Sequence, residues 1–219
     1  MTSSAVLRLA RLDVRSVAPY RNAQVLLMVI LAPLLAAIWG EPASALVMAV
    51  VFATFLAAYP FAVADKNDLD TLYGMLPVAR RAVVVGRLVF SLGLFAAALA
   101  YGGVATAALA TLMHRPLTAE DAVMVVTISF AIFALMAALQ FPFYWAFGYT
   151  KARAASFVPL FALAFGVGVV SIATGQDPTG TFPGAPSAAL VAAVSLIGGT
   201  VALAVSTALS VRLDARRVR

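Results

Sequence analysis

Side chains that could act as catalysts or metal ligands are few in this 219-residue chain, and they are scattered. The sequence holds one histidine, His114, no cysteine and nine acidic residues. A zinc site needs several nitrogen, sulfur or carboxylate ligands at short spacings, and a hydrolase needs a nucleophile beside a base. Neither arrangement is readable here. We therefore predict no catalytic residues and no metal site in this chain, with His114 as a solvated loop residue.

The densest group of charges lies in "DKNDLDTLYGMLPVARR", residues 65–81. Charged residues make up 11% of the chain, yet six of these 17 positions carry a charge. Leu69, Leu72, Tyr73 and Leu76 recur at helical spacing and would share one face of a short helix. A helix of about two turns is unstable by itself in water. Its apolar face therefore needs a surface, which is either the inner leaflet of a membrane or a protein partner.

Two arginines, Arg80 and Arg81, follow Pro77 at the point where the next helix would begin. The helix macrodipole disfavours positive charge in a first turn, by about 0.3–1 kcal/mol for each residue. In one interpretation, lipid phosphate at the inner membrane surface compensates for this cost. In the other, an acidic partner surface does so.

The elements that must position this segment are membrane spans. Hydrophobic residues make up 63% of the chain, and several apolar stretches approach or exceed the roughly 20 residues that cross a bilayer as a helix. We predict an all-α polytopic membrane protein whose single transmembrane domain covers residues 1–219. Its six predicted transmembrane helices are residues 23–39, 43–64, 82–112, 122–147, 155–174 and 187–211.

Lysine and arginine set the expected orientation, because cytoplasmic loops carry an excess of them. With an internal N-terminus, 14 of the 15 basic residues lie inside and only Arg115 lies outside. We therefore predict a multi-pass protein of the cytoplasmic (inner) membrane with both termini in the cytoplasm. The net charge of +6 then reflects the membrane surface rather than nucleic acid.

Residues 1–22 precede the first predicted span and are rich in arginine. On a helix, Arg8, Arg11 and Arg15 fall within a narrow arc beside a side formed by Val6, Ala10, Val14 and Val17. This pattern favours an interfacial amphipathic helix whose arginines meet lipid phosphates. Two alternatives stay open, a basic lead-in that only sets topology and a cleaved signal peptide.

Polar side chains inside the predicted spans are rare. Gln140 and Tyr144 lie in an aromatic stretch of the fourth span, where they would either line a cavity or make interhelical hydrogen bonds and anchor the helix at the interface. Arg87 is the one charged residue that enters an apolar run, and we expect it to snorkel to the inner surface. The scarcity of ionisable groups within the spans argues against an ion-coupled carrier.

The run "ADKNDLDTLYGMLPVARRAVVVGRLVF", residues 64–90, resembles the signature of small six-span permeases of ATP-binding-cassette (ABC) exporters, the type-2 membrane family. In that family an acidic-basic pair follows the second span, a "SLPVSR" pattern comes next, and a lysine or arginine opens the third span. Met75 and Ala79 stand here where the family usually has serine. The matching residues are Asp65, Lys66, Leu76, Pro77, Val78, Arg80 and Arg87.

The resemblance implies that residues 65–81 form a coupling helix that docks on a separate ABC ATPase subunit, which would hold ATP and Mg. It also implies two permease chains, identical or different, with two ATPases. The chain itself lacks the GxxxxGK[ST] phosphate-binding motif. The implied docking residues are Leu69, Asp70, Leu72, Tyr73, Leu76, Pro77, Arg80 and Arg81.

The predicted function is that of the permease subunit of an ATP-driven exporter. Apolar, nearly uncharged spans favour an amphipathic or lipophilic cargo, such as a peptide, lipid or drug, moved across the membrane by alternating access. Two alternatives of other classes stay open. They are a membrane scaffold or assembly protein without transport activity, and an ion-coupled secondary carrier.

Overall fold

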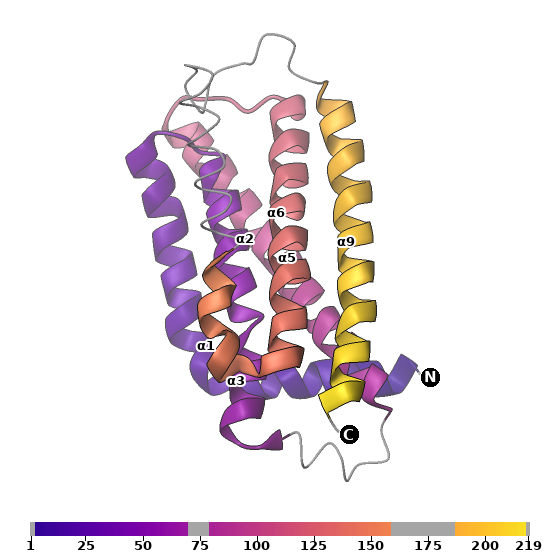
Figure 1. Ribbon diagram of the computed structural model, residues 1–219. Coiled ribbons are helices and arrows are strands. Elements are labelled where there is room, and N and C mark those ends of the chain that lie inside the picture. The colour runs from indigo at the N-terminus through magenta and orange to yellow at the C-terminus, as the bar shows by residue number, and fades with distance from the viewer. Residues whose placement is uncertain (1–2, 70–78, 159–186, 218–219) are drawn as a thin grey trace.

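The computed structural model describes residues 3–69, 79–158 and 187–217 of the chain, and within these ranges it is helical without strands (Figure 1). This confirms the predicted all-α class. The elements are α1 (Ser3–Trp39), α2 (Ser44–Leu56), α3 (Tyr59–Lys66), α5 (Arg80–Leu112), α6 (Ala119–Phe147), α7 (Tyr149–Ala152), the 3₁₀ helix η1 (Arg153–Phe157) and α9 (Ala188–Arg217).

Five helical segments of the described residues are long and apolar enough to cross a membrane. They match the first, second, third, fourth and sixth predicted spans closely. The fifth predicted span, residues 155–174, lies almost wholly outside the described residues. The five segments are Asn22–Trp39, Ser44–Lys66, Arg80–Leu112, Ala119–Phe147 and Ala189–Asp214.

Helix α1 is continuous from Ser3 to Trp39, yet it changes direction. Its N-terminal part runs across the lower end of the bundle in Figure 1, and its remainder rises along the bundle. The sequence has Pro19 before the apolar part begins at Asn22, and proline removes a backbone donor and bends a helix. A helix over the N-terminal residues is therefore present, with Arg8, Arg11 and Arg15 exposed. Its placement at a membrane interface stays a prediction.

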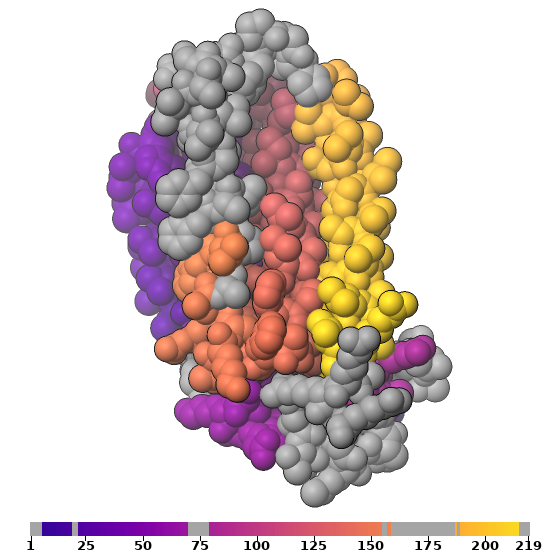
Figure 2. Space-filling view, viewed as in Figure 1, coloured from indigo at the N-terminus to yellow at the C-terminus, as the bar shows by residue number. Residues whose placement is uncertain are grey.

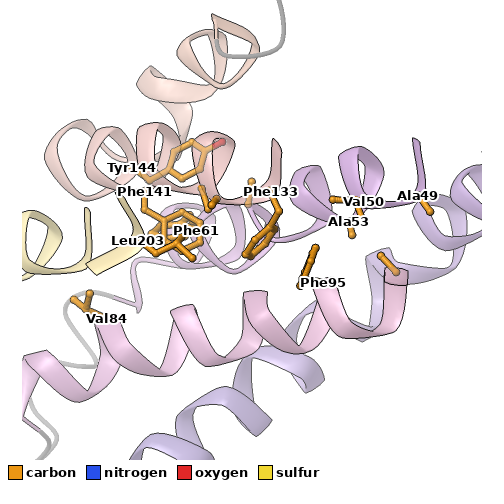
Figure 3. Packing of buried hydrophobic residues seen from close by; sticks show 14 of the residues in the cluster. Ala49, Val50, Ala53, Phe61, Val84, Phe95, Phe133, Phe141, Tyr144 and Leu203 are labelled. Atoms are coloured by element: carbon orange, nitrogen blue, oxygen red, sulfur yellow. The ribbon is translucent and has the colours of Figure 1, made fainter. Parts of the chain in front are cut away.

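The interior is built from aromatic rings and small residues (Figure 3). Phe95 of α5 stacks on Phe133 of α6 with ring centroids 4.7 Å apart. Small residues let neighbouring helices come close. A Cβ atom at Gly102 of α5 would lie only 2.8 Å from the Cα atom of Leu46 in α2. Gly199 of α9 lies equally close to α6, but there the nearest atoms belong to the side chains of Phe130 and Ala134.

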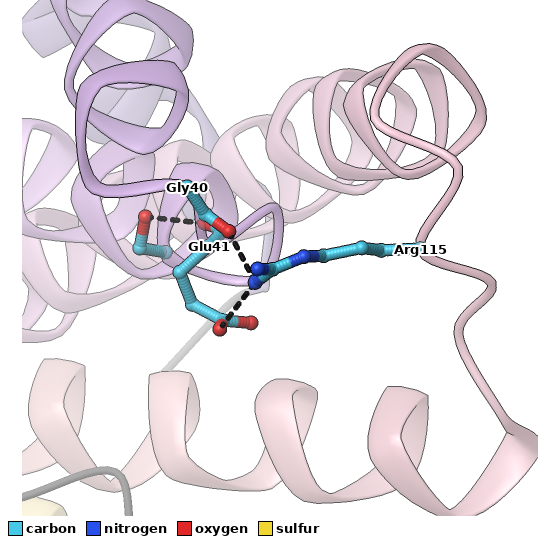
Figure 4. A network of polar contacts seen from close by, with 4 residues as sticks. Gly40, Glu41 and Arg115 are labelled. Atoms are coloured by element: carbon cyan, nitrogen blue, oxygen red, sulfur yellow. Dashed lines mark hydrogen bonds and ion pairs between the residues drawn. The ribbon is translucent and has the colours of Figure 1, made fainter.

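The loops at the upper end of Figure 1 are joined through Arg115 (Figure 4). Its guanidinium donates a hydrogen bond to the carbonyl oxygen of Gly40, and Nη1 lies 3.8 Å from Oε2 of Glu41. The contact connects the α1–α2 turn to the α5–α6 loop. The next helix, α6, begins with a capping box in which Thr118 and Asp121 satisfy each other's backbone amides. His114, in the same loop, is exposed as predicted.

The glycine contact between α2 and α5 gives a prediction about stability. Gly102→Ala should place a methyl group against backbone and destabilise the fold by about 1–3 kcal/mol, whereas Gly103→Ala meets only one atom, at 4.0 Å. The control should be neutral or stabilising, because alanine favours a helix over glycine. The measurement is the thermal unfolding midpoint of the purified protein. Equal midpoints for the two variants would contradict the close contact.

Candidate coupling site

One end of the bundle gathers most of the basic residues, and we call it the basic end. It comprises the N-terminal part of α1, the end of α3, the start of α5, α7 and the last turns of α9 (Figure 1). Both described ends of the predicted docking loop, residues 65–69 and 79–81, lie here. Of the predicted docking residues, Leu69, Arg80 and Arg81 are described. The others, Asp70, Leu72, Tyr73, Leu76 and Pro77, lie outside the described residues.

The first end of the loop is fixed by Asp65, at the end of α3. Its Oδ2 atom accepts hydrogen bonds from the backbone amide of Thr150 at 2.9 Å and from the Thr150 hydroxyl at 2.6 Å. Thr150 lies in the first turn of α7, where backbone amides lack partners within the helix. Gly148, with φ of 77°, makes the turn between α6 and α7. The loop is therefore tied to the α6–α7 turn.

The second end of the loop is fixed by Arg80, the first residue of α5. Its Nη1 atom lies 3.3 Å from Oδ1 of Asp214, near the end of α9. Asp214 is buried, so the ion pair is partly shielded from water and is worth more than a pair on an open surface. Arg81 is exposed, and it lines a different groove together with Arg212.

Arg87, two turns further along α5, is buried with 3% of its surface exposed. Its guanidinium carbon lies 4.3 Å from the ring centroid of Phe61 and 4.7 Å from that of Trp145. The prediction that Arg87 snorkels to the surface is therefore wrong. Two aromatic faces stabilise the cation in place, and such contacts are worth about 2 kcal/mol or more away from water. Its Nε and Nη2 atoms have no hydrogen-bond partner among the described residues.

Asp13 of α1 is the acidic group near this arginine. It is buried, and burial raises the pKa of its carboxyl to about 6, while the positive charge of Arg87 acts to lower that pKa. A close crossing brings the two helices together. A Cβ atom at Gly86 of α5 would lie 3.0 Å from Cβ of Leu9 and 3.4 Å from the carbonyl oxygen of Val6.

Asp13 was missed as a site residue by sequence reasoning. The buried side of the N-terminal helix contains Ala10, Asp13 and Val17, while Val14 is 49% exposed. Val14 was predicted to share a side with Ala10 and Val17, and on the helix it does, but only the latter two are buried. The signal was present, because Asp13 follows Ala10 by three residues and precedes Val17 by four. An acid on the apolar side of a helix that otherwise carries arginines indicates a buried partner.

Gln140 and Tyr144 of α6 are both buried. The Tyr144 ring lies 4.9 Å from Phe61 and 5.6 Å from Tyr149, measured between centroids. Tyr144 also borders a cavity of about 630 Å³ toward the basic end. Their role in a transport pathway stays a prediction. The cavity wall further includes Gln24, Phe52, Phe55, Tyr59 and Arg153.

The family model described as ABC-2 family transporter protein matches residues 9–213, which is nearly the whole chain. The chain belongs to the ABC-2 transporter family. Membership indicates the permease of an ABC transporter, set in a membrane and partnered by an ABC ATPase. No curated protein and no solved structure matched this ABC-2 permease.

The structure thus joins several elements of this ABC-2 permease around the predicted docking loop. Asp65 connects one end of the loop to α7, and Arg80 connects the other end to α9. Arg87 then holds α5 against α3 and α6. No group of three or more metal-ligating side chains is present among the described residues.

The raised pKa of Asp13 predicts a pH dependence of stability. The folded chain binds the Asp13 proton at a higher pH than the unfolded chain, whose pKa is near 3.8. Lowering the pH from 7 to 5 should therefore stabilise the native protein relative to Asp13→Asn, by on the order of 1 kcal/mol. Thermal unfolding at several pH values measures this. Asp68→Asn, at an exposed position, is the control and should keep the native dependence. A pH profile of Asp13→Asn parallel to the native one would contradict the assignment.

Proposed function

We propose that this chain is the permease subunit of an ATP-driven exporter, with a separate ABC ATPase docked on residues 65–81. One observation carries the proposal beyond family membership. Both described ends of the loop are anchored by charged side chains to helices remote in sequence, at separations of 85 residues for Asp65–Thr150 and 134 for Arg80–Asp214. A loop tied in this way is suited to pass a displacement to the bundle.

The proposed transmission uses these ties. Closure of the ATPase around ATP and Mg displaces the loop. Asp65 then moves the α6–α7 turn, and Arg80 moves the end of α9. Hydrogen bonds with an ionised partner are stronger than neutral ones, so both contacts resist stretching. The aromatic packing around Arg87 makes the start of α5 move together with α3 and α6.

A second permease chain, identical or different, would complete the translocation pathway. The apolar segments of α1 and α9 are each only 11% buried, compared with 67% for the segment of α2 and α3. Figure 2 shows α9, in yellow, along one side of the bundle. Such surface is available to lipid and to a second chain. We propose alternating access at that interface, with both termini on the cytoplasmic side of the inner membrane.

The cavity bordered by Tyr144 supports an amphipathic or lipophilic cargo. Its wall is mainly aromatic, and Arg153 and Gln24 add polar groups. Gln24 donates a hydrogen bond of 2.8 Å to the Tyr59 hydroxyl, so one side of the cavity is polar and ordered. A peptide, lipid or drug with an apolar body fits this combination. Because the cavity lies toward the proposed cytoplasmic end, we propose uptake there and export.

The docking proposal predicts the effect of two changes in the loop. Leu72→Asp, or Arg80→Glu combined with Arg81→Glu, should abolish co-purification with the ABC ATPase while membrane insertion remains. Each change removes either the apolar contact or the basic flank of the docking surface. Leu117→Asp, in the loop between α5 and α6 at the opposite end, is the matched control and should keep the ATPase. Retained ATPase in both loop variants would favour a scaffold or a secondary carrier.

The ion pair between α5 and α9 predicts a charge-swap result. Arg80→Asp and Asp214→Arg each leave like charges facing one another, and either change should reduce transport in vesicles containing permease and ATPase. The double variant restores opposite charges and should recover a large part of the activity. Co-purification with the ATPase is measured in parallel. If the double variant is no better than the worse single variant, the contact does not transmit movement.

A further inference from the structure

A groove of about 510 Å³ lies between the start of α5 and the last turns of α9. It is separate from the cavity bordered by Tyr144. Of the residues that line it, only Arg81 also belongs to the proposed docking surface. Its α9 wall is one helical stripe, because its positions follow each other at spacings of three, one, three and one. That stripe consists of Ala204, Thr207, Ala208, Val211 and Arg212.

The groove has a charged end and an apolar body. Arg81 on α5 and Arg212 on α9 are exposed and stand at the basic end. Leu88 lies two turns along α5 from Arg81, and the alanines lie one and two turns along α9 from Arg212. The Thr207 hydroxyl donates to the carbonyl oxygen of Leu203 at 2.7 Å, so it needs no partner from a bound molecule.

Arg81 and Arg212 also differ from the neighbouring Arg80, which forms an ion pair with an acidic residue. Asp214, the acid nearest to them in the α9 sequence, forms its ion pair with Arg80. Neither Arg81 nor Arg212 has an acidic partner among the described residues. Among the described residues, these two cations at the mouth of an apolar groove have no acidic partner and give its lining an excess of positive charge, which an anionic ligand would neutralise.

We propose that this groove binds one anionic phospholipid of the leaflet at the basic end. The phosphate lies between Arg81 and Arg212, and an acyl chain follows the alanine stripe of α9. Ala204 and Arg212 are separated by about 12 Å along the helix axis, which accommodates a substantial part of an acyl chain. Basic pockets between membrane helices are recognised sites for acidic headgroups. The groove lies within two membrane-spanning segments, so a lipid reaches it directly.

The inference deepens the proposed function, since it rests on the same membrane setting. A bound lipid would join α5 to α9 beside the Arg80–Asp214 ion pair. It would thereby stabilise the contact through which the loop is proposed to act on α9.

The test uses the full-length permease, purified in detergent and titrated with phosphatidylglycerol or phosphatidylcholine, with bound lipid counted by native mass spectrometry. The native chain should retain one phosphatidylglycerol preferentially. Arg212→Gln and Arg81→Gln should each weaken that binding by roughly 5-fold, and the double variant by about 25-fold. Ala208→Trp fills the groove without changing charge and should also lose the lipid. Lys66→Gln with Lys151→Gln is the charge-matched control and should bind normally.

Three results would overturn the proposal. Equal binding of phosphatidylcholine by the native chain would make the site merely apolar. An equal loss in the lysine control would reduce the effect to overall charge. Displacement of the lipid by glycerol phosphate alone would identify a soluble anion as the occupant. ATPase co-purification is scored with Arg212→Gln, which lies outside the docking surface. Lipid loss with retained ATPase separates this inference from the docking proposal.

Discussion

A guanidinium removed from water must be stabilised by its surroundings, and at Arg87 this requirement brings four helices together. Desolvating a cation costs several kcal/mol even after relaxation. Phe61 of α3 and Trp145 of α6 offer their ring faces at 4.3 and 4.7 Å, and Asp13 of α1 supplies negative charge nearby. Any movement that separates these groups exposes a poorly compensated charge. The helices that meet at Arg87 are therefore constrained to move together.

That constraint gives the neighbouring ion pair its significance. Arg80 and Arg87 are separated by about 10 Å on the same rigid helix, so the contact with Asp214 and the aromatic contacts act on one body. Asp65 lies in α3, the same helix that carries Phe61. The two described ends of the proposed docking loop are thus attached to the same packed centre. The α6–α7 turn and the end of α9 are linked to that centre by hydrogen bonds that involve charged groups.

The spans were predictable because each depends on a local property, a long apolar stretch, and the five that the structure describes lie close to their predicted limits. Basic residues and apolar spacing also indicated the helix over the N-terminal residues. The site could not be assembled in this way. The partners of Arg87 come from three segments far from it in sequence, and burial of Asp13 rather than Val14 depends on how α1 crosses α5 at Gly86. Whether Arg87 reaches the surface depends on those tertiary contacts.

The same contacts account for a departure from the family pattern. Ala79 occupies the N-cap position of α5, where a serine could accept a hydrogen bond from the first turn, and it makes no side-chain cap. Alanine in place of serine at such a position costs about 1 kcal/mol. Two arginines in the same turn add an unfavourable interaction with the helix dipole. A helix start with these two defects would fray if it depended on local interactions alone. Here Arg80 is held by Asp214 and Arg87 by two aromatic rings, so tertiary contacts fix the helix start that a cap would otherwise stabilise.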